Sequence, residues 1–166
     1  MHFKVDYLPD NSFVTIGAAY QVNITNQEEV EKTVDQVVTD FNGRLDVFVA
    51  NSGIAWSEGP ALDSSVSHYR EVLSTNLDGV YYSALAAGKH WRRQAKDRTT
   101  IHGKELEHFT LGSFIATASM SGHIVNVPHI QAAYNVSKAG VIHLCKSSEE
   151  NDPNDRSFVD YIYPNR

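Results

Sequence analysis

A largely apolar run at residues 45–50 (LDVFVA) limits the folds open to this chain more than any other feature, and it ends at Asn51, Ser52 and Gly53. Such a run between turn-forming residues is typical of a strand buried on both faces, because a half-exposed strand would alternate apolar with polar residues. We therefore expect an inner strand of a parallel sheet here.

The residues before this strand predict a short strand followed by an amphipathic helix. Residues 18–24 are β-prone, and Asn26 with Glu29 three positions later are the N-cap and N3 residues of a helix start. The apolar stripe of the helix consists of Val30, Val34, Val37, Val38 and Phe41, before Asn42 and Gly43 end it. The order strand, helix, strand indicates an α/β fold.

The alternation of strands and helices continues to about residue 146. Further elements are expected as helices at residues 63–94 and 131–146, a second buried strand at 113–119, and a polar surface insertion at 96–110 that is either mobile or hairpin-like. The first of these helical regions should be two helices that meet near residues 75–78. We expect one domain over residues 1–166, in which residues 18–146 carry the fold and residues 1–17 and 147–166 are irregular ends.

Composition and charge narrow the class of protein. The chain has 166 residues, 42% hydrophobic residues and a net charge of −6, which is typical of one soluble domain and argues against nucleic acid or an anionic membrane as partner. Cys145 is the single cysteine and no run is long and apolar enough for a membrane span, so a reducing, cytoplasmic location is expected. The 8 histidines lack the spacing of metal ligands, and no metal site is predicted.

Tyr134 and Lys138 form the sharpest chemical motif. An i, i+4 pair shares one face of a helix, and a neighbouring ammonium favours the phenolate form of a tyrosine, as a general acid/base requires. The pair alone is weak evidence, since 8 tyrosines make a chance match easy. Ser119 and Ser121 at the end of one predicted strand, and Asn76 at the predicted helix junction, add hydroxyl and amide groups to the same edge.

With these residues together, the sequence resembles the short-chain dehydrogenase/reductase family over residues 18–146, and most closely its fungal NADP-dependent mannitol dehydrogenases and ketose (sorbose, xylulose) reductases. The matching positions are the strand-end motif Asn51, Ser52 and Gly53, the junction residue Asn76, the serine Ser119, and the pair Tyr134 and Lys138. The stretch at residues 118–126 followed by Pro128 narrows the resemblance to that branch.

The resemblance implies a role for each matching residue. Tyr134 would pass a proton to the substrate oxygen as hydride leaves the nicotinamide, Lys138 would assist Tyr134 and bind the nicotinamide ribose, and Ser119 would hold the carbonyl oxygen, with Ser121 as its rival. Asn76 would hold a water that relays protons. The implied cofactor-binding residues are Asn23 and Ile24 at the adenine, Asn51, Ser52 and Gly53 beside its ribose, and Tyr134 with Lys138.

The resemblance also implies a partial fold: an incomplete Rossmann-like, doubly wound, three-layer parallel sheet that lacks the first βαβ unit with its glycine-rich turn and the last strands. Gly17 is the only glycine before Gly43, so that turn is not in the first forty residues. The implied function is NADP-dependent interconversion of a ketose and a polyol, with NAD not excluded, by a homodimer or homotetramer when the protein is full length. The alternative is a truncated, inactive fragment that acts at most as an oligomerisation or binding module.

Overall fold

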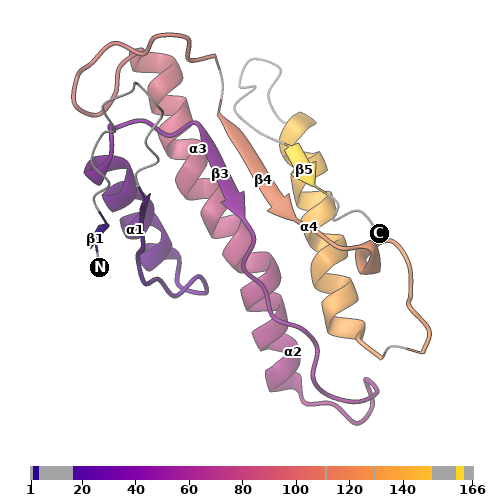
Figure 1. Cartoon of the computed structure of the whole chain (residues 1–166). Coiled ribbons are helices and arrows are strands. Elements are labelled where there is room, and N and C mark those ends of the chain that lie inside the picture. The colour runs from indigo at the N-terminus through magenta and orange to yellow at the C-terminus, as the bar shows by residue number, and fades with distance from the viewer. Residues whose placement is uncertain (1, 4–16, 111, 129, 151–159, 163–166) are drawn as a thin grey trace, which may run out of the picture.

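The computed structural model describes residues 2–3, 17–110, 112–128, 130–150 and 160–162 (Figure 1). The strands are β1 (His2–Phe3), β2 (Gly17–Ala18), β3 (Val47–Ala50), β4 (Ser113–Thr117) and β5 (Asp160–Ile162). The α-helices are α1 (Gln27–Asp40), α2 (Val66–Leu73), α3 (Gly79–Asp97) and α4 (Ala132–Glu150). A π-helical turn, Ser74–Asp78, joins α2 to α3, and a 3-10 turn, Met120–Gly122, follows β4. None of the described helices is long and apolar enough to cross a bilayer.

Three parallel strands form the main sheet in the order β3-β4-β5, and the parallel α/β fold expected from the sequence is confirmed. β3 and β4 pair from Val47 with Ser113 to Ala50 with Ala116. β1 and β2 form a separate antiparallel pair. The irregular tail expected at residues 147–166 was wrong in part, because α4 continues to Glu150 and β5 pairs with β4 from within that segment. Residues 1–17, expected to be irregular or a weak strand, contain the short strand β1.

The described helices cover one face of this sheet. Phe114 and Ala116 of β4 lie in the main core with Trp91 of α3 and Val141 of α4. α1 packs against α3 and Phe48, on the same face. In Figure 1 the strands lie in front of α3 and α4. The described residues thus supply two of the three layers of a doubly wound sheet.

β3 is not buried on both faces in the described structure, contrary to the expectation from its apolar run. Val47 and Val49 are 53% and 56% exposed, whereas Ala50 on the other face is 8% exposed. One edge of β3 pairs with β4, and no described strand pairs with the other edge. Apolar residues on a bare strand face are a surface that further protein would normally cover.

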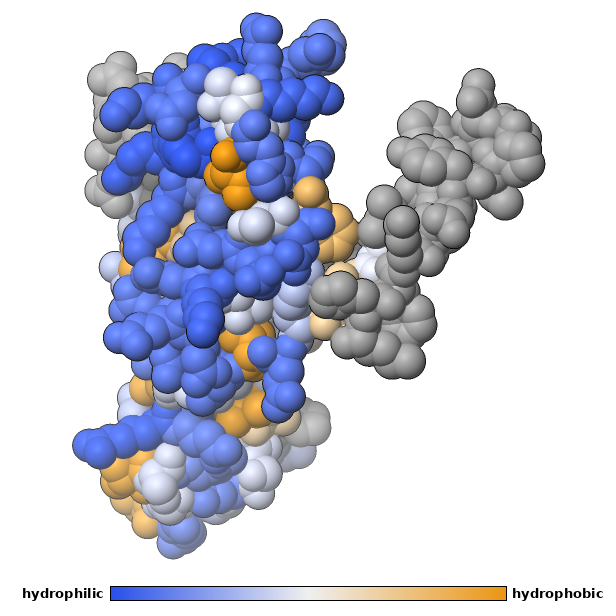
Figure 2. All heavy atoms as spheres, turned by 90° about the vertical axis from the view of Figure 1, so that its left-hand side faces the viewer, coloured by the Kyte–Doolittle hydropathy of each residue, from blue (hydrophilic) through white to orange (hydrophobic). Residues whose placement is uncertain are grey.

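Helix α1 begins and ends where the sequence predicted. Asn26 is its N-cap and accepts a hydrogen bond from the Glu29 backbone N–H at 3.2 Å. Ion pairs join its outer side to α3, from Lys89 to Glu31 at 2.8 Å and from His90 to Asp35 at 2.8 Å. The view onto this side of the molecule is mostly hydrophilic, with small apolar patches (Figure 2). α1 therefore turns its polar stripe outward and its valines inward.

Side chains of α3 shorten β3 at its start. The strand was expected from residue 45, but it begins at Val47. The Leu45 carbonyl accepts hydrogen bonds from Trp91 Nε1 at 3.1 Å and Gln94 Nε2 at 2.7 Å, and its N–H donates to Gln94 Oε1 at 2.7 Å. Leu45 thus satisfies its backbone groups with α3 instead of a neighbouring strand.

The segment at residues 96–110 is the hairpin that its turn residues predicted, but it is not wholly a surface insertion. Thr99 bridges Glu105, and Gly103 has a positive φ of 78° at the turn. Leu106 and Phe109 are only 3% and 2% exposed and complete the core beside α3. Two apolar residues in a polar segment therefore anchor the hairpin.

Candidate active site

The carboxyl ends of β3 and β4, the π-helical turn and the first half of α4 meet at one edge of the sheet. Lys138 Nζ donates a hydrogen bond to the Thr117 carbonyl oxygen at 2.6 Å, and Thr117 Oγ1 donates to Asn51 Oδ1 at 2.8 Å. This chain of contacts joins α4 to the ends of both strands. The expectation that polar residues from distant parts of the sequence share this edge is therefore met for Asn51 and Lys138.

Lys138 is held in a desolvated position beside Tyr134. Lys138 is only 4% exposed, and burial lowers the pKa of its ammonium because the charged form loses hydration. Lys138 Nζ lies 5.8 Å from the centroid of the half-buried Tyr134 ring. The pair is arranged as the i, i+4 spacing predicted, on one face of α4.

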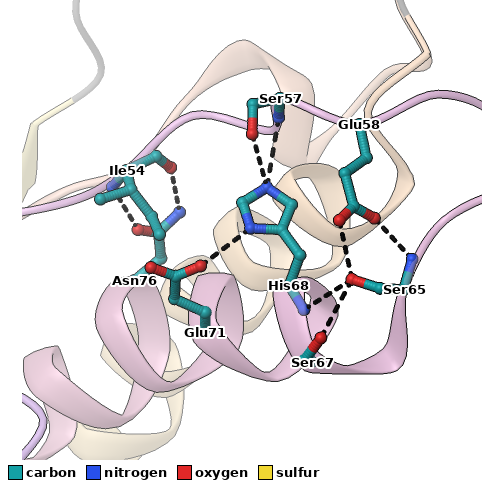
Figure 3. A network of polar contacts seen from close by, with 8 residues as sticks. All are labelled: Ile54, Ser57, Glu58, Ser65, Ser67, His68, Glu71 and Asn76. Carbon is teal, nitrogen blue, oxygen red and sulfur yellow. Dashed lines mark hydrogen bonds and ion pairs between the residues drawn. The ribbon is translucent and has the colours of Figure 1, made fainter.

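Asn76 is fully buried in the π-helical turn and binds the chain just after β3. Its Oδ1 accepts from the Ile54 N–H at 2.7 Å, and its Nδ2 donates to the Ile54 carbonyl at 2.9 Å (Figure 3). Nδ2 also donates to Ser137 Oγ at 3.2 Å, and Ser137 Oγ donates to the Tyr134 carbonyl at 2.8 Å. Asn76 therefore ties the strand end to α4. Asn76 lies at the helix junction that the sequence predicted.

Gly53 lies where only a small residue fits beside these side chains. A Cβ atom on Gly53 would lie 3.1 Å from Asn76 Oδ1 and 3.7 Å from Lys138 Nζ. The first of these distances is tighter than most side-chain contacts. Gly53, Asn76 and Lys138 thus converge from three elements.

Ser119 and Ser121 differ in how free their hydroxyl groups are. Ser119 caps the short 3-10 turn, where its Oγ accepts from the Ser121 N–H at 3.2 Å, and it is half-buried. Ser121 is 6% exposed, and its Oγ accepts hydrogen bonds from Asn126 and Gln131, both at 2.9 Å. The geometry favours Ser119 over Ser121 for contact with a bound molecule.

The residues expected near a cofactor's adenosine half lie beside a hollow of about 340 Å³ between α1 and β3. Ile24, Asn51 and Ser52 line it, together with valines of both elements. Asn23 and Gly53, which were also expected there, are not among the lining residues. Asn23 Oδ1 accepts hydrogen bonds from the Thr25 backbone N–H at 3.1 Å and the Thr25 hydroxyl at 2.8 Å. Asn23 thus shapes the turn that presents Ile24.

Two residues in the site were not predicted as functional. Thr117 accepts the hydrogen bond from Lys138 and donates one to Asn51, and Ser137 links Asn76 to Tyr134. Thr117 is inside an apolar strand and Ser137 inside the Tyr134 to Lys138 spacing, so neither differs in sequence from an ordinary strand or helix residue. Only their positions in space identify them.

Lys138→Met should make the folded chain more stable at neutral pH. A buried ammonium costs free energy that an apolar side chain of similar length does not, and the half-buried Thr117 carbonyl loses one hydrogen bond in return, so we expect a net gain of about 1 kcal/mol at pH 7. The folded-state pKa of Lys138 lies below its ordinary value of 10.5, so the cost is fully present below that lowered pKa. This cost is relieved as pH rises towards 10.5, so the difference in free energy of unfolding between the variant and the wild type should disappear there. Urea unfolding at pH 7 and pH 10 measures this, and a variant less stable than wild type at pH 7 contradicts it.

The chain belongs to the short-chain dehydrogenase/reductase family. The family model described as enoyl-(acyl carrier protein) reductase matches residues 10–148. The family that the sequence resembles is therefore confirmed.

Individual relatives share a ketose or polyol in their names. The chain is 61% identical over 129 residues to L-xylulose reductase of Hypocrea jecorina, covering 78% of this chain and 45% of that protein. It is 39% identical to a probable NADP-dependent mannitol dehydrogenase of Yarrowia lipolytica, with 87% and 46% covered. It is 37% identical to sorbose reductase of Candida albicans, with the same coverage. The chain thus spans about half the length of these relatives.

Solved structures match the same portion of the fold. The NADPH-dependent 3-quinuclidinone reductase of Rhodotorula rubra is 34% identical with a TM-score of 0.66, covering 87% of this chain and 47% of that one. A short-chain type dehydrogenase/reductase of Mycobacterium marinum is 29% identical with a TM-score of 0.73, covering 86% and 50%. The partial Rossmann-like fold expected from the sequence is therefore confirmed.

Proposed function

We propose that this chain is the catalytic half of an NADP(H)-dependent oxidoreductase that interconverts a ketose and a polyol. The observation that carries the proposal is the convergence of Gly53, Asn76 and Lys138, beside Tyr134, at the carboxyl ends of β3 and β4. The relatives' names, which include xylulose, sorbose and mannitol, support the substrate class.

The proposed proton donor is the Tyr134 hydroxyl. Lys138 Nζ lies 5.8 Å from the centroid of the Tyr134 ring, and from this position on α4 Tyr134 would give a proton to a carbonyl oxygen and take it back in the reverse direction. Ser119 would orient that oxygen by donating its hydroxyl proton. Asn76 would keep the π-helical turn and the strand end in register, which holds these groups at fixed distances.

The residues present fit part of a dinucleotide. Ile24, Asn51 and Ser52 line the hollow beside β3 and would face the adenosine half, whereas Val47 and Val49, which also line it, belong to the apolar face that further protein would normally cover. Gly53 allows the Asn76 and Lys138 side chains to approach the backbone at the strand end closely. When bound, NADP(H) would supply or accept the hydride. NADP is proposed over NAD on the names of the relatives alone.

A second candidate is a chain that does not catalyse and acts only by binding family members. The unpaired edge and exposed valines of β3 favour it, because such a surface can pair with or pack against another chain. The described residues also include no glycine-rich turn that would bind the cofactor's phosphates. Calorimetric titration of the 166-residue chain with NADPH separates the two. We expect weak or absent binding to the isolated chain, and a micromolar dissociation constant would count against the binding-module reading.

The catalytic proposal is tested by completing the chain. Residues 18–146 would replace the matching segment of the 61% identical L-xylulose reductase, and NADPH oxidation would be followed with L-xylulose, D-fructose and L-sorbose. We expect turnover with at least one ketose. A folded chimera that binds NADPH but reduces none of the three contradicts the proposal. The dimer or tetramer proposed for the full-length protein, built on α2, α3 and α4, would be read from the mass of the same chimera in solution.

A further inference from the structure

A second group of side chains suited to nucleophilic chemistry, apart from Tyr134 and Lys138, joins the loop after β3 to helix α2. Ser57 Oγ is 3.0 Å from His68 Nε2, and His68 Nδ1 is 2.9 Å from Glu71 Oε2 (Figure 3). Hydroxyl, imidazole and carboxylate in this order are the arrangement that activates serine in hydrolases and acyltransferases.

The backbone of Ser57 determines which histidine nitrogen carries the proton. The Ser57 N–H donates to His68 Nε2 at 3.3 Å, and an N–H can only donate, so Nε2 is the unprotonated nitrogen in this arrangement. The proton is then on Nδ1, where Glu71 accepts it. The single lone pair of Nε2 is therefore shared between the Ser57 N–H and the nearer Ser57 hydroxyl, towards which it can act as base.

A second set of hydrogen bonds holds the turn on α2. Glu58 accepts from the Ser65 N–H and from Ser65 Oγ, and these bonds lower the pKa of the Glu58 carboxyl because they favour its charged form. Ser65 Oγ in turn accepts from the His68 N–H at 3.1 Å as the N-cap of α2. The residue next to the serine and the backbone of the histidine are thus fixed to the same side chain.

The exposure of Ser57 and the aromatic ring beside His68 allow a small aromatic or acyl reagent to reach the group. Ser57 is exposed, whereas the His68 side chain is only 14% exposed. The half-buried Trp56 ring lies 4.8 Å from the His68 ring, centroid to centroid, and offers an apolar surface beside the hydroxyl. Because the Ser57 N–H is used by His68, it does not serve as an oxyanion donor, so the reaction requires an ester with a good leaving group.

We propose that Ser57 is a nucleophilic serine that takes an acyl group from activated carboxylic esters, with His68 as its base and Glu71 as a positioning residue. Ser57 Oγ forms a bond to the carbonyl carbon while its proton passes to His68 Nε2. The bond from that carbon to the leaving oxygen breaks, and the leaving group takes the proton from His68. Water then releases the acid from Ser57 by the same steps. This activity is separate from hydride transfer and does not rest on it.

The test is acetylation by p-nitrophenyl acetate. The 166-residue chain should release p-nitrophenolate and carry an acetyl group on Ser57, located by mass spectrometry. Ser57→Ala and His68→Gln should each lower the release rate by at least about tenfold. Ser67→Ala is the matched control, because Ser67 is also an exposed serine, its Oγ donates to Ser65 rather than to a histidine, and its loss should change nothing.

Two further measurements separate chemistry from structure. Glu71→Ala should slow acetylation severalfold and Glu71→Asp should restore most of it, which a purely structural role would not require. If a single substitution unfolds the isolated chain, the same variants are measured in the chimera with L-xylulose reductase. An unchanged rate in Ser57→Ala, acetylation elsewhere but not on Ser57, or equal labelling of Ser57 in urea would overturn the proposal.

Discussion

Tyr134→Phe in the completed chimera should reduce NADPH-dependent ketose reduction by at least about a thousandfold, which is within the range for loss of a general acid. The substitution removes one oxygen atom and leaves the ring that faces Lys138 Nζ at 5.8 Å. The described residues form no hydrogen bond with the Tyr134 hydroxyl that would stabilise the fold. The free energy of unfolding should therefore change by less than about 0.5 kcal/mol. Stopped-flow reduction and urea unfolding of the same preparation measure both effects.

Tyr81→Phe is the matched control for this experiment. Tyr81 is 46% exposed on α3 and is not among the residues that converge at the strand ends, so its hydroxyl should be dispensable. NADPH affinity should fall much less than the rate in Tyr134→Phe, because the main proposed loss is of proton transfer, and the other expected cofactor contacts are retained. Activity within about threefold of the parent would remove Tyr134 from the proposed mechanism.

The sequence was sufficient for features that depend on local chemistry. The Asn26 cap, the end of α1 before Gly43 and the helix junction around Asn76 each follow from one or two residues whose preferences are strong. The i, i+4 spacing likewise placed Tyr134 and Lys138 together. These elements were predictable because no distant residue is needed to explain them.

Features that depend on distant partners were not predictable. Leu45 is apolar and precedes a strand, but Trp91 and Gln94, about fifty positions later, take its backbone groups. Phe109 looked like part of a polar hairpin, yet it fills the core. The exposed face of β3 shows the opposite error: its valines predict burial, and the described residues do not include what would bury them.

The candidate site shows the same division. Its chemical types could be identified from the sequence, but the hydrogen bonds that join Thr117 to Asn51 and Lys138 could not, because a threonine in a strand carries no distinguishing signal. The nucleophile group at Ser57 was missed for a similar reason. Its serine is in a loop and its histidine on the next helix, and their spacing matches no sequence motif.

Asn76→Ala should lower the free energy of unfolding by about 3 kcal/mol, because a buried backbone group left without a partner costs about 1–3 kcal/mol. The Asn76 side chain is fully buried and satisfies both the N–H and the carbonyl of Ile54. Urea unfolding measures the loss. Asn42→Ala is the control, since Asn42 is exposed and accepts a single bond from Arg44, and it should cost less than about 0.5 kcal/mol.

Asn76→Leu distinguishes the lost hydrogen bonds from the lost volume. Leucine fills a space similar to that of asparagine but offers no donor or acceptor, so a cost equal to that of alanine means that the polar contacts carry the effect. If leucine restores the stability of the wild type, the bonds to Ile54 are not what holds the strand end to the π-helical turn. In the chimera, both variants should also lose activity. Without its hydrogen bonds to Asn76, Ile54 no longer holds the adjoining Gly53 beside Lys138. The distances between the reacting groups then vary, which lowers the rate.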